Sequence, residues 1–256
     1  MAERGRRRPN PLWMLAEGRS IFEALTLIPT SPMLLSAPKG DGHPVLVIPP
    51  FGAGDGFTTV LRAYLSNRGY DSYRWDRHEI LGLHQLVTVA VRRLKEVYEE
   101  GGERKITLIG HSLGGIYARE IARAAPDLVR AVITVGSPFA GNLKANYVWP
   151  MYEQATGTRV DSIPTAFLER MNEPPPVPST AMFSRTDGVA SWWCCVDEAR
   201  PEAENIEVPG SHIGLLHNPL VLYVIADRLA QPEGEWQPFE RTGLKRMLFP
   251  DRGAVG

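Results

Sequence analysis

Three short stretches of this sequence carry the residue types that nucleophilic catalysis needs. Ser112 lies at the centre of Gly-His-Ser-Leu-Gly at 110–114, which fits the pattern G-x-S-x-G. Asp187 and His212 lie further along the chain, so the order is serine, aspartate, histidine. A serine hydroxyl is a poor nucleophile at neutral pH, and it needs a base to accept its proton and a third group to orient that base. We therefore take these three residues as the candidate catalytic set.

The surroundings of Ser112 match what such a serine requires. Residues 106–109 are apolar and β-prone, and the pattern after Ser112 predicts a helix that ends near Pro126. Glycines two residues before and after the serine allow a sharp turn in which strand and helix approach without Cβ clashes. The alternative is a glycine-rich turn with an idle serine, but the strand–turn–helix context favours a functional one.

The elements around this turn must place the other two side chains beside it. Up to residue 135, predicted strands alternate with predicted helices, which indicates a parallel sheet with helices on both faces. The predicted strands are 45–48, 70–75, 106–109, 129–135, 180–184 and 206–208. Asp187 and His212 follow the last two strands, and the carboxyl ends of parallel strands meet at one edge of a sheet.

With these motifs in this order, the chain resembles the α/β-hydrolase family, in particular compact bacterial lipases and esterases. The resemblance covers about residues 44–230 and rests on the serine turn at 109–115, the acid turn at 184–189 and the histidine loop at 211–215. It implies an α/β-hydrolase fold with a mostly parallel sheet of about six strands. It also implies Ser112 as nucleophile, His212 as general base and then acid, and Asp187 as the orienting carboxylate, with no metal and no organic cofactor.

The resemblance also implies two backbone N–H groups that hold the oxyanion. One belongs to Leu113, directly after the nucleophile, and the other comes from the loop after the first strand. That loop reads Pro-Pro-Phe-Gly at 49–52 where related proteins often have His-Gly-x. Proline has no N–H, so the matching donor is Phe51.

The expected substrate is a small-molecule or lipid carboxylic ester. Phe139, Trp149 and Trp192 flank the catalytic segments and are candidates to line an apolar acyl site, or else they pack the core. A thioesterase, an amidase or an acyltransferase on the same fold is the alternative. A membrane-surface lipid-binding or interaction protein is a more distant one.

The predicted domain limits are residues 1–36 for a tail and apolar helical segment, 37–233 for the hydrolase domain and 234–256 for a C-terminal tail. Residues 140–178 break the strand–helix rhythm and predict a small helical insertion, either a cap over a pocket or an ordinary crossover. Residues 1–36 combine arginines with an apolar stretch, which favours either a helix packed on the domain or peripheral contact with a membrane.

Composition narrows the class of protein. With 43% hydrophobic residues, 22% charged residues and a net charge of -1, the chain is ordinary globular material and nucleic acid is not an expected partner. No apolar run approaches the roughly 20 residues of a membrane span. The only cysteines, Cys194 and Cys195, are adjacent, which excludes a disulfide framework. A cytoplasmic protein is expected, with peripheral membrane contact as the variant.

Overall fold

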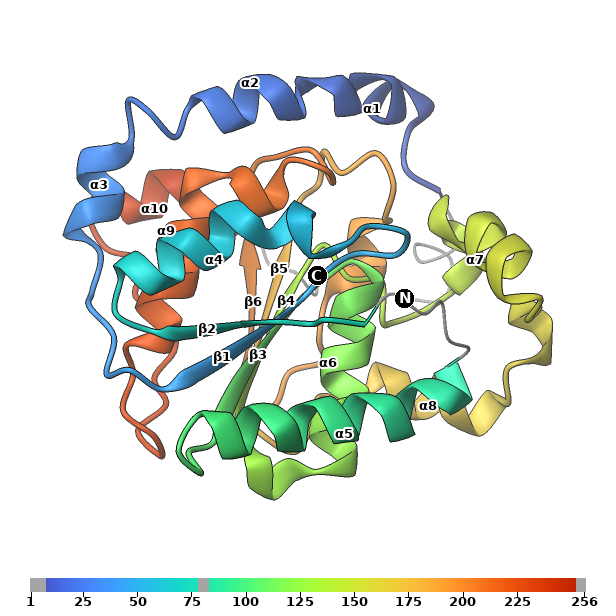
Figure 1. The fold of residues 1–256 in the computed structure, drawn as a ribbon. Helices are drawn as coiled ribbons and strands as arrows, with labels where there is room; N and C mark the ends of the chain where they lie inside the picture. Colours follow the sequence, from blue (N-terminus) through green and yellow to red (C-terminus); the bar gives the residue numbers. More distant parts are fainter. Residues whose placement is uncertain (1–7, 78–82, 252–256) are drawn as a thin grey trace.

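The fold is built on one fully parallel sheet, in a computed structural model that describes residues 8–77 and 83–251. The six strands are ordered β2-β1-β3-β4-β5-β6 (Figure 1). Their bounds are β1 Pro44–Ile48, β2 Asp71–Arg74, β3 Ile106–His111, β4 Val129–Val135, β5 Ser179–Phe183 and β6 Ala203–Glu207. The predicted parallel α/β architecture with about six strands is therefore confirmed.

Ten α-helices among the described residues accompany these strands, together with short 3-10 turns. The helices are α1 Pro11–Leu15, α2 Ser20–Leu25, α3 Ser31–Ser36, α4 Thr59–Asn67, α5 Leu83–Glu100, α6 Leu113–Ala124, α7 Val148–Thr156, α8 Thr165–Asn172, α9 Pro219–Leu229 and α10 Lys245–Leu248. The 3-10 turns are η2 Ala16–Arg19, η3 Asp55–Thr58, η4 Pro126–Leu128, η5 Leu143–Ala145, η6 Val160–Ser162, η7 Trp192–Cys195 and η8 Leu215–His217. Within the described ranges, no helix combines the length and apolarity needed to cross a bilayer.

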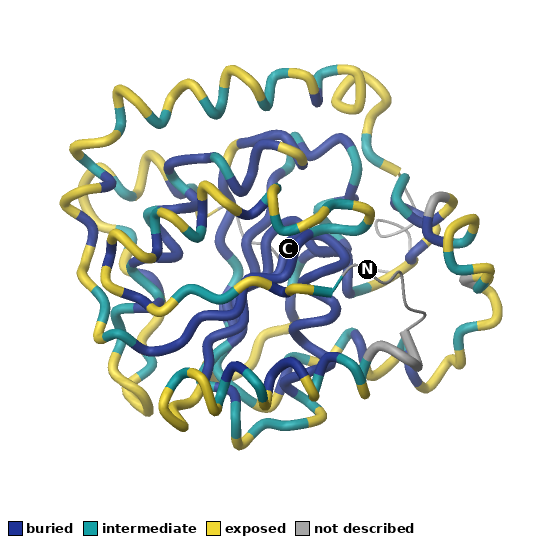
Figure 2. Tube along the Cα trace, viewed as in Figure 1, coloured by how far each residue is buried: buried dark blue, intermediate teal, exposed yellow. Residues whose placement is uncertain are grey.

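The strands divide their side chains between two hydrophobic cores, because successive strand residues point to opposite faces. In β1, Leu46 and Ile48 join the core under α5, α6 and α8, whereas Val45 and Val47 join the core under α4 and α9. All residues of β1, β3 and β5 are buried (Figure 2), as the continuous apolar runs predict for a sheet covered on both sides. The polar strand β2 lies at the edge.

The strand order reverses at β1, since β2 lies on one side of it and β3 on the other. In open α/β sheets such a switch point leaves a crevice at the carboxyl ends of the two central strands. The loop after β1 carries Phe51, and the turn after β3 carries Ser112. The topology therefore brings both to the same crevice.

The predicted insertion at 140–178 contains two helices with different surroundings. In α8, Phe167 and Met171 are buried in the core beside α6, so α8 covers the sheet as an ordinary crossover helix does. In α7, Trp149 and Tyr152 are also buried, and the Tyr152 ring lies 5.8 Å from that of Phe51. Helix α7 therefore borders the loop after β1.

The predicted C-terminal tail includes a part that packs on the domain. Phe239 and Phe249 are 3% and 1% exposed, and their rings meet edge to face at 5.0 Å within the core under α9. The backbone N–H of Phe239 donates to Glu204 in β6. Apolar burial of these two rings holds the described residues after 233 against the sheet layer.

Replacing Phe249 by Ala should therefore destabilise the protein by about 3–5 kcal/mol, the usual cost of removing a buried phenylalanine ring. Urea unfolding followed by circular dichroism measures the change. Met247, 81% exposed two residues earlier, is the control, and Met247→Ala should stay within about 0.5 kcal/mol of wild type. Equal stability of the two variants would contradict the packing described here.

Candidate active site

Ser112 occupies a strained turn between β3 and α6. Its φ is 54° and its ψ is -123°, a backbone conformation that residues other than glycine seldom adopt. Such a conformation costs of the order of 1–3 kcal/mol and persists only where its surroundings hold it. Here the Ser112 N–H donates to the Val135 carbonyl at 2.9 Å, and the Ser112 carbonyl accepts from Gly115 at 3.0 Å. The predicted strand–turn–helix context of the serine is thus present.

The turn is also too crowded for side chains at its glycines. A Cβ built on Gly110 would lie 2.2 Å from the carbonyl oxygen of Gly114, and one on Gly114 would lie 2.5 Å from the carbonyl oxygens of Ile48 and Pro49. These clashes would be with backbone atoms, which cannot move aside without disturbing the strands and the helix. The two glycines therefore allow α6 to start directly against the ends of β1 and β3.

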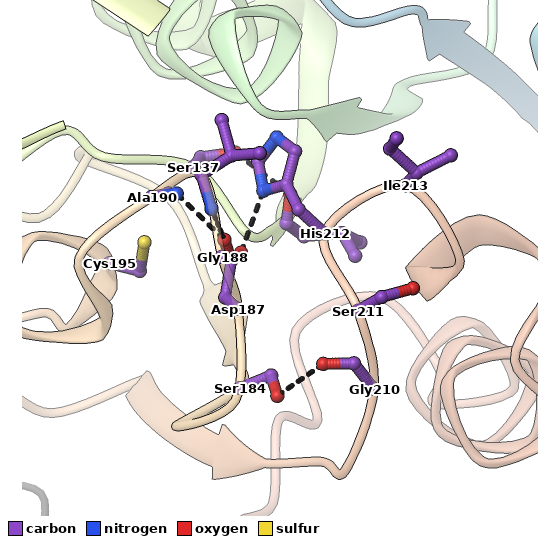
Figure 3. A network of polar contacts seen from close by, with 12 residues as sticks. Ser137, Ser184, Asp187, Gly188, Ala190, Cys195, Gly210, Ser211, His212 and Ile213 are labelled. Atoms are coloured by element: carbon purple, nitrogen blue, oxygen red, sulfur yellow. Dashed lines mark hydrogen bonds and ion pairs between the residues drawn. The ribbon is translucent and has the colours of Figure 1, made fainter. Parts of the chain in front are cut away.

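Asp187 and His212 form a buried pair at the same edge of the sheet (Figure 3). The Nδ1 atom of His212 lies 2.6 Å from Oδ2 of Asp187, and both residues are under 10% exposed. The other carboxylate oxygen of Asp187 accepts from the N–H groups of Val189 and Ala190, at 2.8 and 2.7 Å. Because Asp187 accepts from Nδ1–H, the Nε2 atom of His212 is left with a lone pair.

The pKa of His212 is set by opposing influences. Burial lowers it, but the adjoining carboxylate of Asp187 raises it, and Glu17 adds to that effect. The net result is a pKa above the ordinary value of 6.5. His212 is therefore a stronger base than a histidine in water.

Contacts connect the serine turn to this pair. His111, directly before Ser112, donates from Nε2 to the carbonyl oxygen of His212 at 2.9 Å, and the two rings lie 4.9 Å apart. Burial holds the pKa of His111 well below its ordinary value, so its ring is neutral. A Cβ on Gly136, the residue after Val135, would lie 3.3 Å from both Asp187 and His212. The turn after β3, the end of β4 and the loops after β5 and β6 thus converge.

Glu17 is a residue at this site that sequence reasoning missed. Its carboxylate is 6% exposed and accepts three backbone N–H groups, from Gly188 at 2.8 Å and from His212 and Ile213 at 3.0 Å. One side chain from the N-terminal segment (residues 11–36) thereby connects the acid turn to the histidine loop.

Two more charged residues of the N-terminal segment act on the same loops. Glu23 accepts from the N–H and hydroxyl of Ser211 at 2.8 and 2.7 Å, and Arg19 donates to the Thr186 carbonyl at 2.6 Å. All three charged side chains of this segment therefore face the protein. The available signal is that residues 11–36 contain only these three charged residues.

A cleft of about 210 Å³ opens beside the serine turn, lined among others by Phe51, Leu113, Trp75 and Tyr117. Leu113 begins α6, so its N–H is one of the helix amides without an intrahelical acceptor. The structure thus brings the two predicted oxyanion donors, Phe51 and Leu113, to one cleft.

The three aromatic residues considered as acyl-site candidates do not line this cleft. Phe139 and Trp149 are 1% and 2% exposed and belong to the core under α6. The Trp192 ring stacks on Phe183 at 5.5 Å, with the Arg185 guanidinium 3.8 Å from its centroid. Their positions flank the catalytic segments in sequence, but tertiary packing buries Phe139 and Trp149 in the interior and leaves Trp192 partly buried between Phe183 and Arg185. Among the described residues, no cluster of three or more His, Cys, Asp or Glu side chains converges to hold a metal.

Comparison with known proteins by sequence identifies one family. The chain matches the model of the alpha/beta hydrolase family over residues 22–253. A triacylglycerol lipase of Pseudarthrobacter phenanthrenivorans is 44% identical over 55 residues, which cover 22% of this chain and 17% of that lipase. A triacylglycerol lipase of Pseudomonas fragi is 28% identical over 111 residues, 40% of this chain and 38% of that lipase. The matches thus span well under half the length of these relatives.

Comparison by structure gives the same fold. The monoacylglycerol lipase of Paleococcus ferrophilus superposes with a TM-score of 0.54 at 18% identity, covering 74% of this chain and 96% of that one. Est1E from Butyrivibrio proteoclasticus also gives a TM-score of 0.54, at 15% identity, covering 73% of this chain and 87% of that one. At such identities the likeness establishes the fold alone.

Glu17→Ala should destabilise the protein by about 3 kcal/mol or more, because it leaves three buried N–H groups without their charged acceptor. Thermal and urea unfolding measure the loss. Glu99→Ala, on the exposed surface of α5, is the matched control and should change stability by less than about 0.5 kcal/mol. If Glu17→Ala were as stable as this control, Glu17 would not hold the two loops.

Proposed function

The chain belongs to the α/β hydrolase family, and on that premise we propose that it hydrolyses carboxylic esters through an acyl-enzyme formed on Ser112. One observation carries the proposal: the buried pair of His212 and Asp187, 2.6 Å apart, lies at the sheet edge where the strained turn presents Ser112. This is the arrangement of a base, its orienting acid and a nucleophile.

The proposed reaction has two halves. In the first, Nε2 of His212 accepts the Ser112 hydroxyl proton while the serine oxygen attacks the ester carbonyl, and the imidazolium then protonates the departing alcohol. In the second, His212 accepts a proton from water, the hydroxide attacks the acyl carbonyl, and the serine leaves with that proton. Asp187 stays ionised and stabilises the imidazolium in both halves.

The oxyanion of each tetrahedral intermediate is proposed to lie between the N–H groups of Phe51 and Leu113. Both residues line the cleft beside the serine turn, and the start of α6 adds the favourable end of its dipole. Pro49 and Pro50 have no N–H, which leaves Phe51 as the first donor in this loop that faces the cleft. The loss of one such donor typically costs about 10²–10³ in rate.

An apolar acyl group suits the proposed substrate. The cleft is bordered by the apolar side chains of Phe51, Trp75, Leu113 and Tyr117, together with Arg77, and the curated relatives that match in part are triacylglycerol lipases. We therefore propose a lipid-like or other apolar ester, with thioester, amide or acyl-transfer chemistry as the alternatives. Parallel assays on an oxygen ester, a thioester and an amide with the same acyl group separate them.

Ser112→Ala should lower kcat for p-nitrophenyl esters by at least about 10⁴-fold, because no other group forms the acyl-enzyme. An acyl series from acetate to palmitate, read as p-nitrophenolate release, measures the loss and the preferred chain length. Ser66→Ala, exposed on α4, should leave turnover unchanged. Undiminished hydrolysis by folded Ser112→Ala would contradict the proposal.

The pH profile follows from the raised pKa of His212. Only neutral His212 can accept a proton, so kcat/KM should rise with pH through a midpoint above 6.5. Glu17 contributes to raising that pKa, so Glu17→Gln should move the midpoint to lower pH. A stopped-flow or plate assay of kcat/KM between pH 5 and 9 tests both statements. A midpoint below 6.5 in wild type, or an upward move in Glu17→Gln, would contradict them.

A further inference from the structure

The N-terminal segment turns its charged side towards the protein and its apolar side away from it. Its three charged residues bond to the loops at 186–188 and 211–213. Its large apolar side chains are exposed, with Leu15 at 83% and Ile28 at 74%. The others are Leu12, Trp13, Met14, Ile21, Phe22, Leu25 and Leu35. Figure 2 shows this segment as a largely exposed ridge along one side of the molecule.

This arrangement is the reverse of a helix that packs on a domain, where apolar residues face inward. Of the apolar side chains of this segment, Leu34 alone is buried, in the core beside α9, and Leu27 and Met33 pack against the same core. Apolar packing therefore anchors the α3 end of the segment, polar contacts hold the part from Glu17 to Glu23, and the other large apolar side chains are left open to another surface. So many exposed large apolar side chains within one short segment mark a candidate site of interaction.

Charge identifies the kind of surface that fits. The sequence places arginines at positions 4, 6, 7 and 8, shortly before α1. Arg8 is exposed, although its Nε donates to the Lys144 carbonyl at 3.2 Å and its guanidinium lies 5.4 Å from the Tyr147 ring. No acidic residue is left on the outer face, because Glu17 and Glu23 are both bonded inward. A second copy of the chain would present the same apolar face without an acidic counterpart for these arginines. An anionic lipid surface supplies both the apolar depth and the negative charge.

The ridge is continuous with the candidate active site. Ile213, the residue after His212, is 44% exposed, and its N–H donates to Glu17 of the N-terminal segment. In Figure 3 the Ile213 side chain points away from the buried pair of Asp187 and His212. Trp13 lies under the Arg19 guanidinium at 5.2 Å, an aromatic ring beside a cation, as is common at membrane interfaces.

We propose that residues 11–36 bind an anionic lipid surface through this apolar face, and that the positive charge of the arginines at positions 4, 6, 7 and 8 favours anionic over neutral headgroups. Binding in this orientation brings the histidine loop to the lipid. The binding stands independently of the proposed hydrolase, and only the supply of lipid esters to Ser112 depends on it.

Co-sedimentation of the full chain with vesicles tests the proposal. The vesicles are phosphatidylglycerol mixed with phosphatidylcholine, or phosphatidylcholine alone. The test variant is Leu15→Glu with Phe22→Glu, and the matched control is Leu244→Glu with Met247→Glu, at equally exposed positions of the C-terminal region, 76% and 81%. Thermal unfolding verifies that both variants fold. Binding is read as the fraction of protein that sediments with the vesicles, which does not depend on ester hydrolysis.

Wild type and the control should bind the anionic vesicles, and the test variant should bind at least about tenfold more weakly, since two charges must enter the apolar layer. Replacing Arg6, Arg7 and Arg8 by Gln should reduce the preference for anionic over neutral vesicles. Equal binding by the test variant and the control would overturn the proposal, as would the absence of binding by wild type. A wild-type dimer that Leu15→Glu with Phe22→Glu converts to monomer, seen by sedimentation velocity, would assign the face to a second copy instead.

Discussion

The close approach of backbone to backbone at the end of β3 is the constraint on which the rest of the structure depends. Ser112 can hold a φ of 54° only because the Val135 carbonyl and the start of α6 fix it from both sides. This requires β1, β3 and β4 to be adjacent and parallel, with glycine wherever α6 meets them. The sheet order, the two cores and the position of the cleft all follow from satisfying that turn.

Around this rigid centre, the remaining polar residues are held by irregular loops whose geometry comes from buried carboxylates. Asp187 accepts backbone N–H groups of its own turn, and Glu17 accepts N–H groups from two loops. A buried carboxylate is tolerated only when its oxygens are hydrogen-bonded, and each bond in turn fixes a segment of loop. Side chains of residues 17–23 therefore fix the position of these loops, as hydrogen bonds between strands fix the sheet.

Local sequence patterns predicted the sheet and the candidate residues because the signals for both lie within a few consecutive residues. Continuous apolar runs identify strands such as β1, and Gly110 and Gly114 identify the turn between them. The position of Asp187 and His212 after strands is equally local. Which side of residues 11–36 faces the protein is not a local property, because Glu17 contacts Gly188 and Ile213, which lie far away in sequence. Likewise Phe139 and Trp149 follow an aromatic pattern that suits either a pocket or a core, and only their tertiary packing, in the core under α6, decides between the two.

The long sequence separation of those contacts orders events during synthesis. Residues 11–36 are synthesised before their partners at residues 186–213, which follow only after roughly 10–40 s at usual elongation rates. In that interval Glu17 and Glu23 have no loop to bind, and the apolar ridge has nothing to orient it. This segment is thus made well before the loops that hold it, and it can reach its final place only after those loops have formed.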